Sequence, residues 1–138
     1  MNYIAYAVLG LVSYTLVAPL TKLATQDLSS DVVAAVTNGM LVVAAIAVVV
    51  LSADKSLTEA FTHPDAKYMV AAGVCLAVGI LAYYRALAAG PVSVVVPIFG
   101  MFLVTSSAVG ILALDEPLTA KKAVGILLAG VAVYLTAS

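Results

Sequence analysis

The sequence predicts an all-α membrane protein, a bundle of five transmembrane helices. Hydrophobic residues make up 64% of the 138-residue chain and charged residues only 9%, whereas a soluble domain usually carries about 25% charged residues. Five long apolar runs fill the chain, and all seven acidic residues fall between them. Because an unpaired backbone group in hydrocarbon costs several kcal/mol, we expect each run to form a helix.

The bounds of the expected helices follow from the apolar runs. In chain order the helices are Tyr3–Leu23, Val32–Leu51, Tyr68–Ala89, Pro91–Leu114 and roughly Ala120–Ala137. A helix rises about 1.5 Å per residue and the hydrocarbon core is about 30 Å thick, so the first four runs are long enough to span it. The fifth run is marginal in length. We interpret residues 1–138 as one transmembrane domain.

Polar and helix-breaking residues stand at the junctions between the runs. Ser29–Asp31 precede the second run as capping residues, with the acid at the positive end of the helix dipole. Ser56–Glu59 fits a capping box, which predicts either a short interfacial helix or a flexible loop. Gly90-Pro91 predicts the end of one helix and the start of the next. We interpret Asp115-Glu116 as capping the last helix.

The distribution of cations predicts an orientation. With a cytoplasmic N-terminus, four cations lie in cytoplasmic loops and two on the far side: Lys55, Lys67, Lys121 and Lys122 against Lys22 and Arg85. Cytoplasmic loops carry an excess of Lys and Arg, so we expect the N-terminus inside and, after five helices, the C-terminus outside. The margin is small, and insertion of some molecules in the opposite orientation stays open.

Polar residues deep in the apolar runs are the candidates for a binding site, because a partner, a cavity or a ligand must offset their desolvation. We predict five substrate-binding residues: Tyr14, Asn38, Tyr83, Arg85 and Thr105. Structural alternatives remain for three of them. Tyr14 and Asn38 can instead join neighbouring helices by hydrogen bonds, and the long side chain of Arg85 can reach the membrane interface.

Pro97 is the candidate hinge. It removes a backbone hydrogen bond within the run Pro91–Leu114 and frees a carbonyl group near Ser93. Such breaks mark hinges in transporters, although plain membrane helices also tolerate them.

The sequence offers no pattern typical of an enzyme. No histidine lies near a nucleophile, no glycine-rich phosphate loop is present, and the single Cys75 has no His or Cys neighbour at metal-ligand spacing. We therefore expect no catalytic site, no metal site, no cofactor and no nucleic-acid partner.

A series of motifs runs through the last three expected helices. It consists of Tyr83-Tyr84-Arg85-Ala86-Leu87, Gly90-Pro91-Val92-Ser93, Pro97, Leu114-Asp115-Glu116-Pro117-Leu118-Thr119 and Gly125 through Gly130. This series resembles one EamA-type repeat, the building block of the drug/metabolite transporter superfamily. The resemblance covers nearly the whole chain. Common members of this family carry two such repeats of opposite orientation and move metabolites such as amino acids through a central cavity.

Two departures from the family pattern bear on the substrate. Asn38 stands where many members have an arginine, which puts the type of substrate in question. The first run also lacks the membrane-embedded glutamate of the related small multidrug resistance proteins. Without a buried carboxylate to exchange a proton for a cation, a proton-coupled exporter of organic cations is disfavoured.

The resemblance implies a plasma-membrane transporter that moves a small polar, amino-acid-like metabolite by alternating access, with export favoured. Because the chain resembles a single repeat, two copies are expected to supply the inverted pair as a homodimer. An antiparallel homodimer is favoured and a parallel one is possible. The alternatives are a non-transporting membrane subunit or scaffold, and one half of a heterodimeric transporter.

Overall fold

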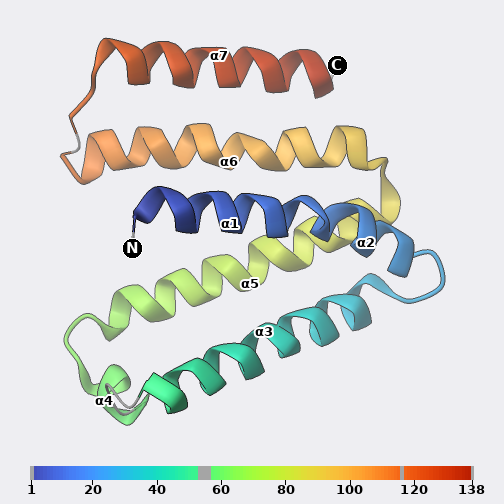
Figure 1. Ribbon diagram of the computed structural model, residues 1–138. Helices are drawn as coiled ribbons and strands as arrows, with labels where there is room; N and C mark the ends of the chain where they lie inside the picture. The colour runs from blue at the N-terminus through green and yellow to red at the C-terminus, as the bar shows by residue number, and fades with distance from the viewer. Residues whose placement is uncertain (1, 53–56, 116, 138) are drawn as a thin grey trace. The chain divides into compact units, whose positions relative to one another are not determined.

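The regular structure of the described chain is helical. A computed structural model describes residues 2–52, 57–115 and 117–137. The termini Met1 and Ser138, Lys55 of the cation count, Ser56 of the capping box and Glu116 of the acidic pair lie outside the described residues. The helices are α1 (Tyr3–Thr15), α2 (Val17–Ala24), α3 (Ser30–Ser52), α4 (Leu57–Thr62), α5 (Ala66–Ala89), α6 (Val92–Ala113) and α7 (Ala120–Ala137) (Figure 1). The prediction of an all-α chain is confirmed for this part.

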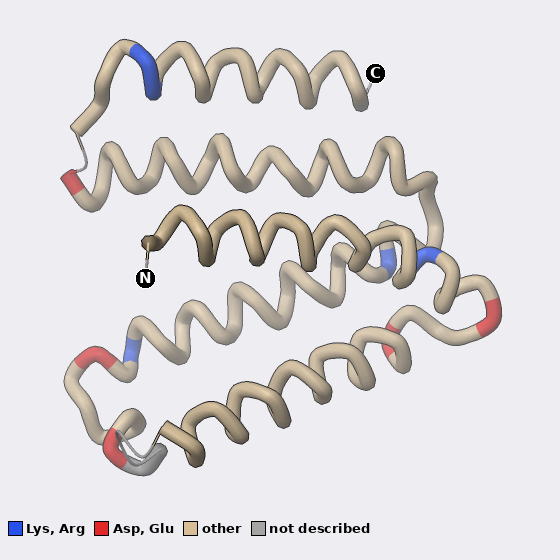
Figure 2. Tube along the Cα trace, viewed as in Figure 1, with Lys and Arg blue, Asp and Glu red and all other residues tan. Residues whose placement is uncertain are grey.

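Four segments of the described chain are long and apolar enough to cross a membrane. They are Tyr3–Ala24, Ser30–Ser52, Ala66–Ala89 and Val92–Ala113. The fifth predicted helix is present as α7, with the predicted bounds and 18 residues, but its crossing of the membrane stays a prediction. Among the described residues, the charged ones lie towards the ends of the long helices, in the connections and in the short helix α4 (Figure 2). This arrangement matches the placement of charges that the sequence analysis used.

The first apolar run forms two helices, whereas we predicted one uninterrupted helix. α1 ends at Thr15 and α2 begins at Val17, with Leu16 between them at φ −87° and ψ −13°. Pro19 has no amide hydrogen to donate to the carbonyl oxygen of Thr15, so the helical hydrogen-bond ladder is broken at this turn. Leu16 nevertheless stays in the right-handed helical region, and the two helices form one 22-residue apolar segment.

The residue contacts divide the chain into two compact units. Residues 1–19 and 89–138 form one unit, here called the α6–α7 unit, and residues 20–88 form the other, the α3–α5 unit. In the α6–α7 unit, α6 and α7 pack against each other and run in opposite directions (Figure 1).

One capping prediction is wrong at the connection between α6 and α7. α6 ends at Ala113 with Leu114 as its C-cap, and the next residue, Asp115, has a positive φ of 53°. Asp tolerates this conformation better than most residues. The start of α7 is capped instead by Thr119, whose hydroxyl oxygen accepts a hydrogen bond of 3.2 Å from the backbone amide of Lys122. The prediction that the acidic pair caps α7 is therefore wrong for Asp115, which follows the C-cap of α6.

In the α3–α5 unit the buried side chains gather where α2 ends, α3 begins and α5 ends. They are Thr21, Val33, Ala34, Tyr83, Tyr84 and Leu87. Towards its other end α3 leaves large apolar side chains uncovered, with Leu51 84% exposed. In a bilayer such surface meets lipid or another protein chain, so this unit has one well-packed end. The short helix α4 confirms the helical alternative for the connection between α3 and α5.

Candidate functional site

An ion pair joins α3 to α5 at the packed end of the α3–α5 unit. The Nε atom of Arg85 lies 3.0 Å from one carboxylate oxygen of Asp31, and its Nη2 atom lies 3.3 Å from the other. This two-point geometry is the strong form of an arginine–carboxylate contact. Both side chains are also open, with 63% of Arg85 and 60% of Asp31 exposed. The pair is thus ordered and yet within reach of another charged molecule.

A hydrogen bond between two hydroxyl groups lies deeper along the same helices. The Oγ1 atom of Thr37 is 2.8 Å from the phenol oxygen of Tyr84, about 9 Å further along α3 than Asp31. The Thr37 hydroxyl also lies 2.8 Å from the carbonyl oxygen of Val33. A hydroxyl group has one proton to give, so when Thr37 donates to Val33, Tyr84 donates to Thr37. Tyr84 is only 5% exposed, and its bond fixes α3 against α5 inside the packed end.

Lys22 links α2 to the end of α5. Its Nζ atom donates to the carbonyl oxygen of Ala88 over 3.1 Å. The last carbonyl groups of a helix have no partner within the helix and carry partial negative charge, so a cation is favoured there. Lys22, Arg85 and Asp31 therefore gather at one end of this unit, and together they carry one net positive charge.

Three of the five predicted site residues lie around the Thr37–Tyr84 bond. Asn38 follows Thr37 on α3, while Tyr83 and Arg85 flank Tyr84 on α5. The amide nitrogen of Asn38 donates to the carbonyl oxygen of Ala34 over 2.8 Å. Tyr83 is 9% exposed, and its ring meets that of Tyr84 edge-on, with the ring centres 6.4 Å apart. The fold therefore brings Asn38, Tyr83 and Arg85 into one region.

The remaining predicted residues lie in the α6–α7 unit. Tyr14 on α1 is 63% exposed. The hydroxyl of Thr105 on α6 faces the carbonyl oxygens of Met101 and Phe102 in its own helix, at 3.3 and 3.2 Å. Pro97 lies inside α6, which continues through it from Val92 to Ala113. The substrate contacts of Tyr14 and Thr105 and the hinge at Pro97 stay predictions.

The sequence analysis missed Asp31 as the partner of Arg85. We interpreted Ser29–Asp31 as capping residues, and Ser29 does cap α3, because its Oγ atom accepts from the backbone amide of Val32 over 3.4 Å. The carboxylate of Asp31, in the first turn of α3, pairs with Arg85. A signal was available: in a chain of consecutive spanning helices, the start of the second and the end of the third lie on the same side of the membrane. An acid and an arginine at these two points are candidates for an ion pair.

Comparison with known proteins assigns the chain to a family. A family model described as the EamA-like transporter family matches residues 1–138. No curated protein and no solved structure matches the chain. The match covers the whole chain and agrees with the apolar helices and with the motif series from Tyr83 to Gly130. The chain is an integral membrane protein and belongs to the EamA-like transporter family, a family of membrane transporters.

Proposed function

We propose that this protein exports a small amino-acid-like metabolite across the plasma membrane, by alternating access in a homodimer. The family assignment supports transport. The chemistry at the packed end of the α3–α5 unit supports the class of substrate.

The observation that carries the proposal is the exposed pair of Asp31 and Arg85. An α-amino acid carries a carboxylate and an ammonium group close together, and the pair offers a guanidinium and a carboxylate with 3.0 Å between Nε and Oδ1. Arginine binds carboxylates through two parallel hydrogen bonds, and a carboxylate accepts from an ammonium group. A zwitterion that enters between the two side chains gives each a new partner of opposite charge. Neither charge is then left unpaired, which is the costly outcome away from water.

Neighbouring polar groups favour the same region for binding. Asn38 and Tyr83 are the sequence neighbours of Thr37 and Tyr84, whose bond joins α3 to α5. They supply an amide and a phenol in that part of the α3–α5 unit. Deep polar side chains of this kind mark substrate paths in membrane proteins. Tyr14 and Thr105 of the α6–α7 unit remain proposed contacts on the sequence pattern alone.

The homodimer follows from the mechanism proposed. Inverted-repeat transporters move one repeat against another of opposite orientation around a central site. We interpret this chain as a single five-helix repeat. A second copy inserted in the opposite orientation supplies the missing repeat. The small cation bias of the loops is compatible with insertion in both orientations, and a parallel homodimer is the alternative assembly.

A second candidate function rests on the same contacts. The Asp31–Arg85 pair, the Thr37–Tyr84 bond and the Lys22–Ala88 bond all tie helices together. A membrane scaffold, a non-transporting subunit or one half of a heterodimeric transporter also needs such ties. In a scaffold the ion pair has only a structural role, and no solute exchanges with it.

Flux measurements in proteoliposomes distinguish the two functions. We expect saturable movement of labelled amino acids by the unmodified protein, and a loss of kcat/KM of at least about tenfold in Arg85→Gln, because a hydrogen bond to a charged group contributes roughly 1.5–3 kcal/mol. The matched control is Lys67→Gln, at the opposite end of α5, whose ammonium lies 5.0 Å from the centre of the Tyr68 ring. Equal flux in the two variants would contradict the proposed site, and absence of flux for every amino acid would favour the scaffold.

A further inference from the structure

A groove of about 380 Å³ lies between α6 and α7. Its lining is mainly aliphatic: Leu103, Val104, Ile111 and Ile126, with Gly125 and Ala129, and only Ser107 and Lys122 are polar. The Ser107 hydroxyl donates to the carbonyl oxygen of Leu103 in its own helix over 2.7 Å. From Ile111 to Leu103 the groove follows α6 for about 12 Å. A cavity this long and this apolar suits a hydrocarbon chain.

A second, shallower furrow runs along the neighbouring face of α7. It measures about 480 Å³ and is lined by Ala120, Lys121, Val124, Gly125 and Leu128. Gly125 lines both cavities, and a Cβ atom added there would meet nothing within 4 Å. The two furrows are therefore separated at this level by a residue without a side chain.

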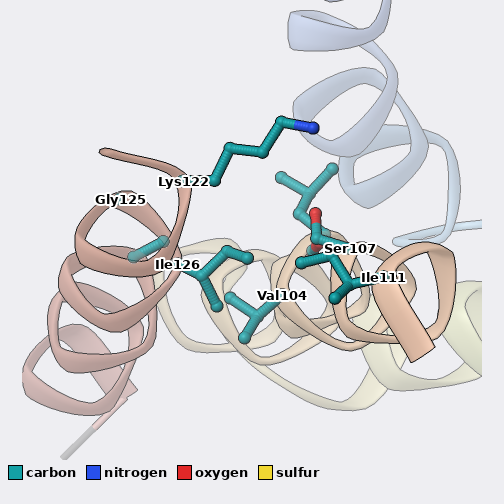
Figure 3. Close-up of a pocket in the computed structure, with 8 residues that line it drawn as sticks. Val104, Ser107, Ile111, Lys122, Gly125 and Ile126 are labelled. Carbon is teal, nitrogen blue, oxygen red and sulfur yellow. The ribbon is translucent and has the colours of Figure 1, made fainter. Parts of the chain in front are cut away.

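Each furrow has a lysine at the end nearest the α6–α7 connection. Lys122 lines the groove and Lys121 the second furrow. Figure 3 shows the Lys122 side chain extending from α7 over the groove, on the same side as the Ser107 hydroxyl. Its Nζ atom donates to the carbonyl oxygen of Pro117 over 3.2 Å, which holds the ammonium group at the level of the connection. In a membrane the ends of spanning helices lie at the depth of the lipid headgroups.

We propose that α6 and α7 form a binding site for one anionic phospholipid. Its phosphate lies at Lys121 and Lys122, and its two acyl chains follow the two furrows, which diverge one turn below the lysines at Gly125. Basic pockets between transmembrane helices attract acidic headgroups, and the aliphatic lining accepts the chains. This site lies within the α6–α7 unit and does not depend on the proposed amino-acid site.

The charges and the lining favour an anionic lipid over other occupants. A polar solute would leave its hydrogen-bonding groups facing aliphatic side chains, which is unfavourable away from water. A spanning helix of a second copy would also cover the apolar lining, and the Gly125→Leu variant described below distinguishes this occupant from a lipid. An anionic phospholipid satisfies both the lining and the lysines.

Native mass spectrometry of the purified protein tests the proposal with dioleoyl phosphatidylglycerol and dioleoyl phosphatidylcholine. We expect phosphatidylglycerol to bind more tightly by about fivefold for each lysine. The double variant Lys121→Gln/Lys122→Gln loses this preference, whereas the matched control Lys67→Gln keeps it. Gly125→Leu weakens binding of both lipids, because the new side chain occupies the space between the furrows. Helix content from circular dichroism checks that each variant is folded.

Three results would overturn the lipid site. The first is an unchanged preference for phosphatidylglycerol in the double lysine variant. The second is displacement of bound lipid by inorganic phosphate, which would indicate a site for a free anion. The third is a Gly125→Leu variant that turns a dimer into a monomer while lipid binding stays the same, which would make the groove a contact between copies.

Discussion

Arg85 and Asp31 differ in how far the sequence revealed their roles. Arg85 stood out because it is the one charged side chain deep in an apolar run, and its contact with substrate stays a prediction. Its partner, Asp31, could not be inferred from the local sequence, because an acid at the start of a helix can equally be explained by helix capping. The ion pair depends on the packing of α3 against α5, which no single segment encodes.

Two adjacent tyrosines on α5 are expected to act differently. Tyr84→Phe removes the phenol oxygen that lies 2.8 Å from Thr37 Oγ1, while Thr37 keeps its bond to the Val33 carbonyl oxygen. We therefore expect a loss of about 1 kcal/mol in the free energy of unfolding, measured by denaturant titration of helix content in mixed micelles. Tyr83→Phe is expected to lower amino-acid flux without unfolding the protein. The opposite pattern would assign the structural role to Tyr83 and the substrate contact to Tyr84.

Length and hydropathy predicted where the apolar helical segments lie. They did not predict where a segment is interrupted. Four of the expected runs are apolar helical segments long enough to cross a membrane, the first of them made of α1 and α2, and α7 has the predicted bounds. The interruption at Leu16 was not predicted, because hydropathy does not show which backbone carbonyl groups have no amide donor within the helix. Pro19 and Pro97 have opposite outcomes: the helix is interrupted three residues before Pro19, whereas α6 continues through Pro97.

Pro97 is expected to control the rate of conformational exchange. Its missing amide hydrogen leaves the Ser93 carbonyl without a helical donor, which softens α6 at that turn. Pro97→Ala restores the donor, so we expect substrate affinity close to that of the unmodified protein and slower exchange between outward-open and inward-open states. Equilibrium binding together with single-turnover flux measures the two quantities. Weaker affinity at an unchanged exchange rate would identify Pro97 as a substrate contact instead.

For the molecule as a whole, the proposed assembly rests on the distribution of cations. Lys22 and Arg85 both lie at the packed end of the α3–α5 unit, consistent with their placement on one side of the membrane in the cation count. The four-to-two count favours a cytoplasmic N-terminus by a small margin. Sequence reasoning could not settle the assembly, because orientation and pairing depend on a second copy.

Positive charge added between α2 and α3 tests whether transport requires copies of the protein in two orientations. Gln26→Lys, Asp27→Lys and Leu28→Lys together change three exposed residues between α2 and α3. The cation count on the side of Lys22 and Arg85 then rises from two to five, against four on the other side, which favours an outside N-terminus. We expect this variant, and one fixed with its N-terminus inside, to lack flux alone and to regain it when co-expressed. Cysteine-accessibility labelling in a Cys75→Ala background reports each orientation. Full flux from a variant held in one orientation would contradict the antiparallel homodimer and favour the parallel one.

Competition during counterflow tests whether the Asp31–Arg85 pair recognises both charges of an amino acid. Proteoliposomes are loaded with the amino acid that the protein moves fastest, and uptake of its labelled form is measured against three unlabelled competitors. These are the amino acid itself, its amide without the carboxylate, and the corresponding acid without the ammonium group. We predict that only the intact amino acid competes, because each analogue leaves Arg85 or Asp31 without its new partner. If either analogue competes as strongly as the amino acid, the pair does not recognise both charges, and the proposed site is wrong.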